Sequence, residues 1–187
     1  MNYITKKAFI LITLLFMLSA CSVDDINTIL QESGSSEDSN EEKEEVIINR
    51  VIDGDTVEVE MPDGSNESVR LLLIDTPESV HPNKPKQPYG EEASEYAKDQ
   101  LPEGKKVDLE YDGSKRGTYD RLLAYIWVDG ENFNQEMLEK GYARYAYEYD
   151  PPYKYQDEFK KAESEAEEAD KRIWSIDGFP ESDFEQW

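Results

Sequence analysis

The sequence of 187 residues is poor in the side chains that most often bind transition metals or form catalytic triads. It contains one cysteine and one histidine. A single cysteine excludes an intrachain disulfide and a cysteine-based zinc site, and a single histidine excludes a histidine-rich metal centre. No Ser-His-Asp triad is evident either. A divalent ion would therefore be bound mainly by oxygen ligands, which suits Ca²⁺ or Mg²⁺.

Positive charge is scarce as well. The chain has 20 Lys and Arg residues against 43 Asp and Glu residues, which gives a formal net charge of −23. A charge of this size keeps a protein soluble and repels polyanions at long range. Taken alone, it argues against a nucleic-acid partner, so such a partner has to be argued from local features of the sequence.

Long hydrophobic runs are also missing. Residues 8–17 form a nearly unbroken apolar run behind a pair of lysines, and this run is too short to span a bilayer as a helix. It is typical of a signal peptide, which we expect over residues 1–20. The Leu-Ser-Ala-Cys sequence that ends at Cys21 resembles the lipobox of bacterial lipoproteins, in which the cysteine is lipidated. The alternative is an ordinary signal peptide with an incidental cysteine.

The segment after Cys21 predicts no ordered structure. Residues 22–45 contain nine acidic residues and one lysine, with no apolar periodicity after Leu30. Such a segment cannot bury enough surface to become ordered. We expect a disordered acidic tether over residues 21–45, a folded domain over 46–177 and an acidic flexible tail over 178–187. The folded domain retains 17 basic and 31 acidic residues, so its net charge is about −14.

Apolar residues alternate with a period of two through the first part of the domain. This alternation indicates three half-buried strands, and it involves Val46, Ile48, Val51, Val57, Val59, Val69, Leu71 and Leu73. Two more strands are predicted over residues 107–111 and 122–128. The composition of residues 89–101 favours a helix.

Two further helices are predicted near the C-terminus. The first is short, begins at a capping box made by Asn132 and Gln135, and ends at Gly141. The second is marked by one apolar stripe with helical spacing, formed by Tyr155, Phe159, Ala162, Ala166, Ala169 and Ile173.

The order of these elements defines the fold class. Three strands, a helix, two strands and two helices predict an α+β fold that is mainly β, a five-stranded OB-fold Greek-key barrel with three α-helices. Barrels of this kind bind nucleic acid across one face.

Three segments concentrate charged groups next to the predicted strands. Asp53-Gly54-Asp55-Thr56 and Asp75-Thr76-Pro77-Glu78 place carboxylates where neighbouring strands end, and hard cations need several such oxygens. Arg70 and Arg121 could then face a phosphate bound to the ion, because the guanidinium donates two parallel hydrogen bonds. Each segment alone is a weak signal, since the same residues are common in plain turns and on solvated strands.

Together the segments resemble the thermonuclease family, also called the staphylococcal nuclease family. The resemblance covers about residues 46 to 176. The motifs that carry it are 53–57 (Asp-Gly-Asp-Thr-Val), 70–78 (Arg-Leu-Leu-Leu-Ile-Asp-Thr-Pro-Glu), His81-Pro82, 89–93 (Tyr-Gly-Glu-Glu-Ala), Arg121 with 123–126 (Leu-Ala-Tyr-Ile), and Ile173-Trp174.

The resemblance implies a Ca²⁺ site with ligands from two segments. Asp55 and Asp75 would bind the ion through their carboxylates and Thr76 through its backbone carbonyl. Asp53 would lie further out and act through water. Glu78 would orient or deprotonate the attacking water. Family members cut DNA and RNA and leave 3′-phosphates.

The resemblance also implies how the substrate is bound. Arg70 and Arg121 would hold the scissile phosphate and stabilise its transition state. Tyr119, Tyr147 and Tyr149 match the positions that line the nucleotide pocket, although the latter two could be packing residues.

A loop of uncertain role separates the second charged segment from the predicted helix at residues 89–101. His81 in this loop is expected to be a solvated residue. Lys84 and Lys86 could either touch phosphates or remain solvated.

Two positions depart from the family pattern. Asp120 stands where glycine is usual, and it could pull Arg121 away from phosphate or simply tighten the turn. Thr118 stands where many members carry a lysine near the terminal phosphate, so affinity could be lower.

The sequence therefore predicts a Ca²⁺-dependent endonuclease, a phosphodiesterase that acts on DNA and RNA. We expect single-stranded or unstructured substrates, a monomer, and a location on the outer side of the bacterial cell membrane, anchored by Cys21 or partly released. One alternative is a non-catalytic OB-fold module that binds nucleic acid or protein on the cell surface. Another is an acidic Ca²⁺-binding surface protein, which leaves Arg70 and Arg121 unexplained.

Overall fold

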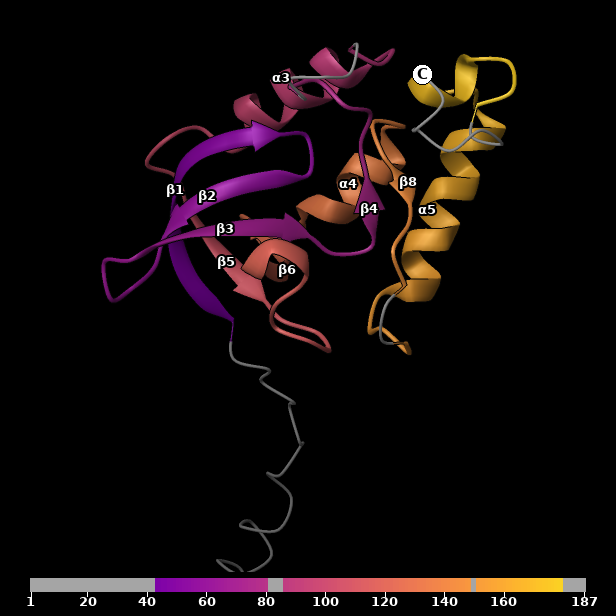
Figure 1. The fold of residues 1–187 in the computed structure, drawn as a ribbon. Coiled ribbons are helices and arrows are strands. Elements are labelled where there is room, and N and C mark those ends of the chain that lie inside the picture. Colours follow the sequence, from indigo (N-terminus) through magenta and orange to yellow (C-terminus); the bar gives the residue numbers. More distant parts are fainter. Residues whose placement is uncertain (1–42, 81–85, 149–150, 180–187) are drawn as a thin grey trace, which may run out of the picture. The chain divides into compact units, whose positions relative to one another are not determined.

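A computed structural model of the chain describes residues 43–80, 86–148 and 151–179 (Figure 1). The predicted signal peptide, Cys21 and nearly all of the predicted tether lie outside these residues. So do His81, Lys84 and Tyr149. No helix within the described ranges has both the length and the apolar composition of a membrane span.

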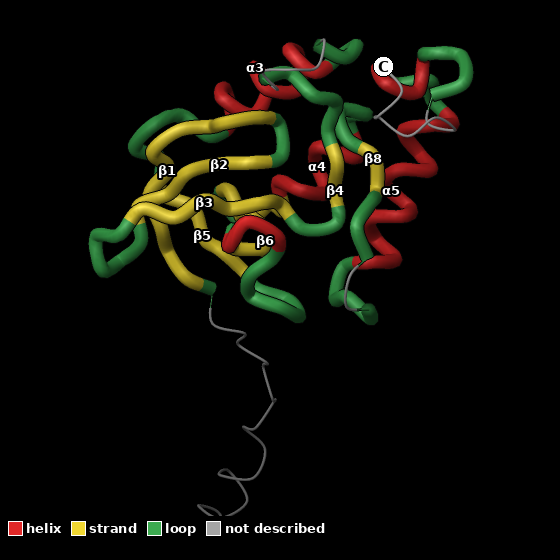
Figure 2. Tube along the Cα trace, viewed as in Figure 1, coloured by secondary structure: helices red, strands yellow, loops and turns green. Residues whose placement is uncertain are grey.

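Five strands of the described chain close into a barrel, seen in yellow in Figure 2. The strands are β1 (Glu44–Asp53), β2 (Thr56–Glu60), β3 (Asn66–Leu71), β5 (Lys106–Glu110) and β6 (Leu122–Val128). Their order is β3-β2-β1-β5-β6, and a parallel pairing of β3 with β6 closes the ring. The predicted OB-fold barrel is confirmed. A short strand β7 (Glu131–Asn132) extends β6, and β1 begins two residues before the predicted start of the domain.

The interior of the barrel follows the predicted alternation. Ile48, Val57, Val59 and Val69 are at most 1% exposed, because every second residue of these strands points inward. The pattern fails from Leu71 onwards, because the four consecutive residues from Leu71 to Ile74 are all buried.

The chain leaves the barrel at this point. Leu73 has a positive φ of 61°, and the next strand, β4 (Ile74–Asp75), pairs with β8 (Arg144–Tyr145) instead of continuing β3. Because of this bend, Asp75 does not continue the barrel strand that carries Arg70. Asp75 lies instead next to β8, which is far away in the sequence.

Within the described residues, three α-helices accompany the barrel: α3 (Gly90–Gln100), α4 (Phe133–Glu139) and α5 (Gln156–Glu168). At the start of α4 the Asn132 side chain accepts a hydrogen bond from the Gln135 backbone, as predicted. The side-chain amide of Gln135, however, donates to Glu139. Of the two hydrogen bonds of the predicted capping box, the structure therefore shows the one accepted by Asn132.

The last predicted helix is divided in two. Helix α5 ends at Glu168, and Asp170 has a positive φ of 46°. Ile173 lies in a separate 3-10 helix (Arg172–Ser175) and packs with Trp174 and with Phe179, which belongs to the predicted tail. The apolar stripe therefore continues across a break in the backbone.

A buried carboxylate fastens the start of α5 to the barrel. Glu110 is 1% exposed and accepts hydrogen bonds from Trp127 Nε1 at 2.7 Å, from Tyr155 Oη at 3.0 Å and from Lys154 Nζ at 2.6 Å. A buried charge needs such partners to offset its desolvation. These hydrogen bonds hold Lys154 and Tyr155, which directly precede α5, against the barrel.

Candidate active site

The turn between β1 and β2 supplies two of the predicted ion-binding carboxylates. Asp53 Oδ1 accepts hydrogen bonds from the Gly54 backbone at 2.8 Å and from Ser79 Oγ at 2.7 Å. Asp55 Oδ2 accepts from the backbone and the hydroxyl of Thr76, both at 2.9 Å. A Cβ on Gly54 would lie 2.9 Å from Thr76 Oγ1, so glycine allows this close approach.

Arg70 links two of the three aspartates of the site, Asp55 and Asp75. Its Nη1 donates to the carbonyls of Leu71 at 3.0 Å and Ile74 at 2.9 Å, which fixes the guanidinium across the bend. Its Nη2 lies 3.2 Å from Asp55 Oδ2 and 3.3 Å from Asp75 Oδ1. One guanidinium nitrogen therefore shares its charge between both carboxylates.

Arg144 is a member of the site that the sequence analysis did not identify. It lies opposite Asp75 in the β4–β8 pairing, and both its Nε and its Nη2 are 3.1 Å from Asp75 Oδ2. Asp75 is thus held by a different arginine on each oxygen. No motif marks Arg144, because only the pairing of two short strands 69 residues apart brings it here.

The carboxylates of the site are buried and lie close to one another. Burial and the nearby charge of Asp55 raise the pKa of Asp53 from 3.8 to about 7, against the hydrogen bonds from Ser79 and Gly54. Burial and the same neighbour raise the pKa of Asp75 to about 6, although Arg70 and Arg144 oppose the shift. Raised carboxylate pKa values of this kind indicate a place where added positive charge would be favourable.

The donor set of this turn is all oxygen and suits a hard cation in its chemistry. Within the described residues, however, no group of three or more His, Cys, Asp or Glu side chains has the arrangement of a metal site. Arg70 pairs with both Asp55 and Asp75, and Arg144 pairs with Asp75.

Glu78 lies beyond Asp75 and faces the same pocket. Its backbone is fixed from both sides by Gln87, which accepts from the Glu78 amide at 2.6 Å and donates to the Glu78 carbonyl at 2.9 Å. Its Oε1 accepts from the Val80 amide at 2.9 Å. A Cβ on Gly90 would meet the Glu78 carbonyl at 2.7 Å, so the start of α3 packs directly on this segment.

Arg121 differs from the other arginines of the described chain, because its side chain makes no hydrogen bond and no ion pair with any described residue. Its Nε is buried without a partner, and its Cζ lies 5.8 Å from the centre of the Tyr119 ring. The Asp120 carboxylate turns away, with Oδ1 3.7 Å from Arg116 Nε. Asp120 therefore leaves the Arg121 guanidinium available in the pocket.

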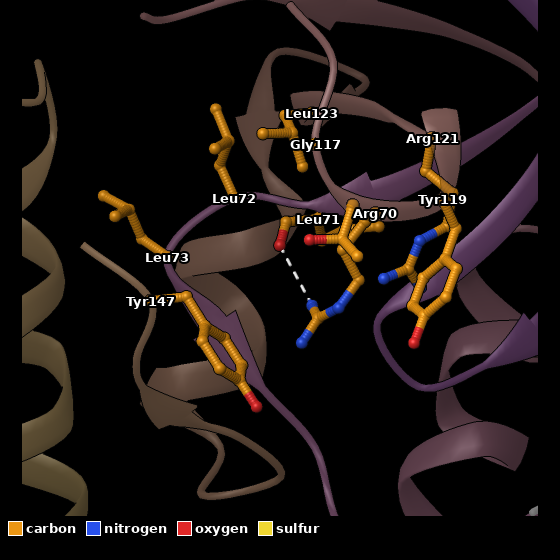
Figure 3. A pocket seen from close by; sticks show the side chains of 10 residues that line it. Arg70, Leu71, Leu72, Leu73, Gly117, Tyr119, Arg121, Leu123 and Tyr147 are labelled. Atoms are coloured by element: carbon orange, nitrogen blue, oxygen red, sulfur yellow. Dashed lines mark hydrogen bonds between the residues drawn. The ribbon is translucent and has the colours of Figure 1, made fainter. Parts of the chain in front are cut away.

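The predicted residues meet in two adjoining pockets. The first, of 410 Å³, is acidic and is lined by Asp53, Asp55, Asp75, Thr76 and Glu78. The second, of 210 Å³, is lined by Leu71, Leu72, Leu73, Leu123 and Tyr119 (Figure 3). Both pockets are also lined by Arg70, Arg121 and Tyr147.

The arginines thus stand where the acidic and the apolar pockets meet. In Figure 3 Arg70 points into the space between the Tyr147 ring and the pair formed by Arg121 and Tyr119. Tyr147 is 45% exposed and its ring centre lies 5.5 Å from Arg70 Cζ, while Tyr119 is 87% exposed. Both rings are open to a ligand.

A closed OB barrel whose rim joins clustered carboxylates, a free arginine and exposed tyrosines defines a class of protein that acts on phosphodiesters. Comparison with known proteins agrees with this class. Residues 68–176 match the sequence profile of the family described as staphylococcal nuclease homologue. The chain belongs to the staphylococcal nuclease family, and its domain is that of a micrococcal-type nuclease.

Individual relatives align over most of the chain. It is 39% identical over 175 residues to the thermonuclease of Staphylococcus hyicus, covering 94% of this chain and 99% of that protein. It is 42% identical over 158 residues to endonuclease YncB of Bacillus subtilis (strain 168), covering 83% and 74%. It is 47% identical over 136 residues to the SPbeta prophage-derived endonuclease YokF of the same strain. That alignment covers 72% of this chain but only 45% of YokF.

Proposed function

We propose that the protein is a Ca²⁺-dependent endonuclease that hydrolyses phosphodiester bonds of DNA and RNA and leaves 3′-phosphates. The observation that carries the proposal is the position of Arg70 and Arg121 on the border of an acidic pocket and a tyrosine-lined pocket. A phosphate on this border would have a cation site on one side and a base site on the other.

The acidic pocket is the proposed Ca²⁺ site. Asp55 and Asp75 would bind the ion through their carboxylates, Thr76 through its backbone carbonyl, and Asp53 through water. When bound, the ion supplies Lewis-acid stabilisation of negative charge on the phosphoryl oxygens. The raised pKa values of Asp53 and Asp75 support this assignment, because both carboxylates are buried close to the charge of Asp55, and a dication would stabilise their ionised forms.

The two arginines are the proposed groups that hold the phosphate and stabilise its five-coordinate transition state. Arg121 is available without displacement, since no carboxylate of the described chain pairs with it. Arg70 is pinned at two carbonyls through Nη1, and a phosphate would compete with Asp55 and Asp75 for its Nη2. Electrostatic stabilisation of this kind is usually the largest catalytic contribution.

Glu78 is the proposed base that orients or deprotonates the attacking water. Its backbone is fixed by Gln87 and its side chain borders the acidic pocket. A carboxylate at this position can accept the proton of a water near the ion.

The tyrosines are the proposed base-stacking groups. Tyr119 and Tyr147 present exposed rings at the two ends of the apolar pocket, and Tyr149 is proposed from its place in the sequence alone. Aromatic faces stack on any base, which favours single-stranded or unstructured substrates.

The location of the protein is also a proposal. We propose a monomer on the outer side of the bacterial cell membrane, anchored through a lipid on Cys21. Cys21→Ala should then move the protein from the membrane fraction to the medium, and retention of this variant in the membrane fraction would reject the lipid anchor.

Digestion of single-stranded DNA tests the enzymatic proposal. The wild type should cleave in Ca²⁺ and not in EDTA, and Glu78→Ser and Arg121→Ala should each lose about 10²–10³-fold in rate. Arg50→Ala is a matched control, because this exposed arginine pairs only with Glu58 on the barrel wall. Binding without Ca²⁺-dependent cleavage by the wild type would instead identify a non-catalytic binding module.

A further inference from the structure

The segment that carries Tyr119 and Arg121 has an energetically unfavourable backbone conformation. Tyr119 and Asp120 both have a φ of 61°, the left-handed region that side chains other than glycine rarely occupy. Each such residue costs about 1–2 kcal/mol. Two in succession require contacts from outside the turn to hold them.

Arg116 supplies these contacts. Its Nη1 donates to the Asp120 carbonyl at 2.6 Å and to Glu67 Oε2 at 3.1 Å, and its Nη2 donates to Glu67 Oε1 at 2.8 Å. Glu67 lies on β3, the strand that also carries Arg70. We call Arg116, Glu67 and Asp120 the Arg116 clamp, because one guanidinium ties the turn to the barrel.

The clamp contacts the backbone immediately before Arg121. The Asp120 carbonyl belongs to the peptide that joins Asp120 to Arg121, and the Arg121 side chain has no hydrogen bond of its own within the described chain. The direction of this guanidinium therefore depends on the backbone that leads to it. Figure 3 shows the side chain beside the Tyr119 ring, which rises from the same turn.

We propose that Arg116 is a positioning residue that fixes the turn from Gly117 to Arg121, so that Arg121 and Tyr119 face the substrate phosphate and base. The inference rests on the proposed function. It also gives Asp120 a role, since its carbonyl and its carboxylate both face Arg116 while its neighbour stays free.

The clamp should matter more for the rate than for global stability. Arg116 is 41% exposed, and exposed ion pairs typically contribute about 0–1 kcal/mol. Displacement of a catalytic group by about 1 Å can nevertheless cost up to about 10²-fold in rate. Loss of the clamp should therefore be visible in kcat before it is visible in the melting temperature.

The main experiment compares Arg116→Gln with Arg50→Gln on single-stranded DNA in Ca²⁺. Arg50 is a matched control, since it pairs with Glu58 across two neighbouring strands as an exposed Arg–Glu pair. Arg116→Gln should lower kcat by about tenfold, because Arg121 acts in the transition state, and should raise KM by about threefold, because Tyr119 on the same turn contacts the base. Arg50→Gln should change neither value. Equal kcat values for Arg116→Gln and the wild type would overturn the proposal.

A double-mutant cycle separates positioning from a general structural effect. In an Arg121→Ala background, Arg116→Gln should cause little further loss of rate, because the group that it positions is already absent. Two losses that multiply would overturn the proposal.

Hydrogen exchange provides a readout that needs no catalysis. The amides of Gly117 and Leu123 donate to the carbonyls of Arg121 and Lys115 across the turn, and their exchange should accelerate in Arg116→Gln. Unchanged exchange would overturn the clamp. If the wild type fails to cleave, the proposed function is what fails, while the exchange data still show whether Arg116 holds the turn.

Discussion

Replacement of Asp53 by asparagine should stabilise the protein in the absence of Ca²⁺. Asp53 Oδ1 accepts hydrogen bonds from Gly54 and Ser79, and an asparagine carbonyl can accept both. The substitution therefore removes the charge and leaves these contacts in place. It removes the unfavourable free energy of burying a negative charge next to the charge of Asp55.

The size of the effect follows from the pKa of Asp53. A rise from 3.8 to about 7 corresponds to about 4 kcal/mol at 1.36 kcal/mol per unit. This value is the upper limit of the expected effect. The expected gain above pH 7 is therefore about 2–4 kcal/mol in the free energy of unfolding.

The sign of the pH dependence is determined by the direction of the shift. The folded state holds the Asp53 proton more tightly than the unfolded state, so this group lowers stability as the pH rises from about 4 to about 7. At pH 8 the full cost is present, and at pH 4.5 most of it is absent. Asp53→Asn should thus gain about 2–4 kcal/mol at pH 8 and about 1 kcal/mol or less at pH 4.5.

Urea unfolding in EDTA, followed by tryptophan fluorescence, measures this difference. Asp63→Asn is the control, because Asp63 is exposed and its hydrogen bonds with Ser65 lower its pKa instead of raising it. Asp63→Asn should therefore bring no stabilisation at pH 8. A gain for Asp53→Asn that is equal at both pH values, or larger at pH 4.5, would refute the electrostatic account of the site.

Two further predictions concern the substrate. Tyr147→Ala should raise KM for single-stranded DNA by about tenfold, in line with about 1–3 kcal/mol per stacked base. Tyr111→Phe is its control, because Tyr111 lies outside both pockets and the change removes one hydrogen bond to Glu44. An unchanged KM in Tyr147→Ala would assign Tyr147 to packing. Binding of single-stranded DNA in Ca²⁺, measured with an inactive Glu78→Ser variant, should depend only weakly on salt, because a domain of about −14 releases few counterions. A steep logarithmic slope in the titration would contradict this second prediction.

The barrel could be predicted because its strands have one buried and one exposed face. The strand predicted over residues 122–128 has these same bounds in the structure, and Val57, Val59 and Val69 point inward as their spacing requires. The run from Leu71 to Ile74 could not be resolved in the same way. All four residues are buried, so the period that marks a strand disappears where the chain bends.

The final helix shows a different limit of periodicity. Ala169 and Ile173 continue the apolar spacing of α5, yet the helix ends at Glu168 and Asp170 takes a left-handed conformation. Gly141 contributes to this arrangement, since a Cβ there would lie 2.5 Å from the Lys171 carbonyl. Spacing alone cannot distinguish a continuous helix from a helix and a 3-10 turn that bury the same face.

The site could be predicted as far as its residues are close in sequence. Asp53 and Asp55 share one turn, and Arg70 and Asp75 lie on either side of one bend, so short stretches of sequence were sufficient to predict that these residues lie close together. Arg144 and Arg116 reach their partners across 69 and 49 residues, through strand pairing and a loop contact. Neither has a local signature, because both depend on the closed fold.

The charges of the site explain how an acidic domain can act on a polyanion. Four carboxylates, those of Asp53, Asp55, Asp75 and Glu78, face three guanidiniums, those of Arg70, Arg121 and Arg144. With all carboxylates ionised the local sum is −1, and a bound dication makes it +1. Attraction for phosphate would therefore arise only after the ion binds, and only near Arg121, the one arginine of the described chain without an acceptor. In the salt titration, replacing Ca²⁺ by EDTA should then abolish binding at every salt concentration, because the remaining surface repels the substrate.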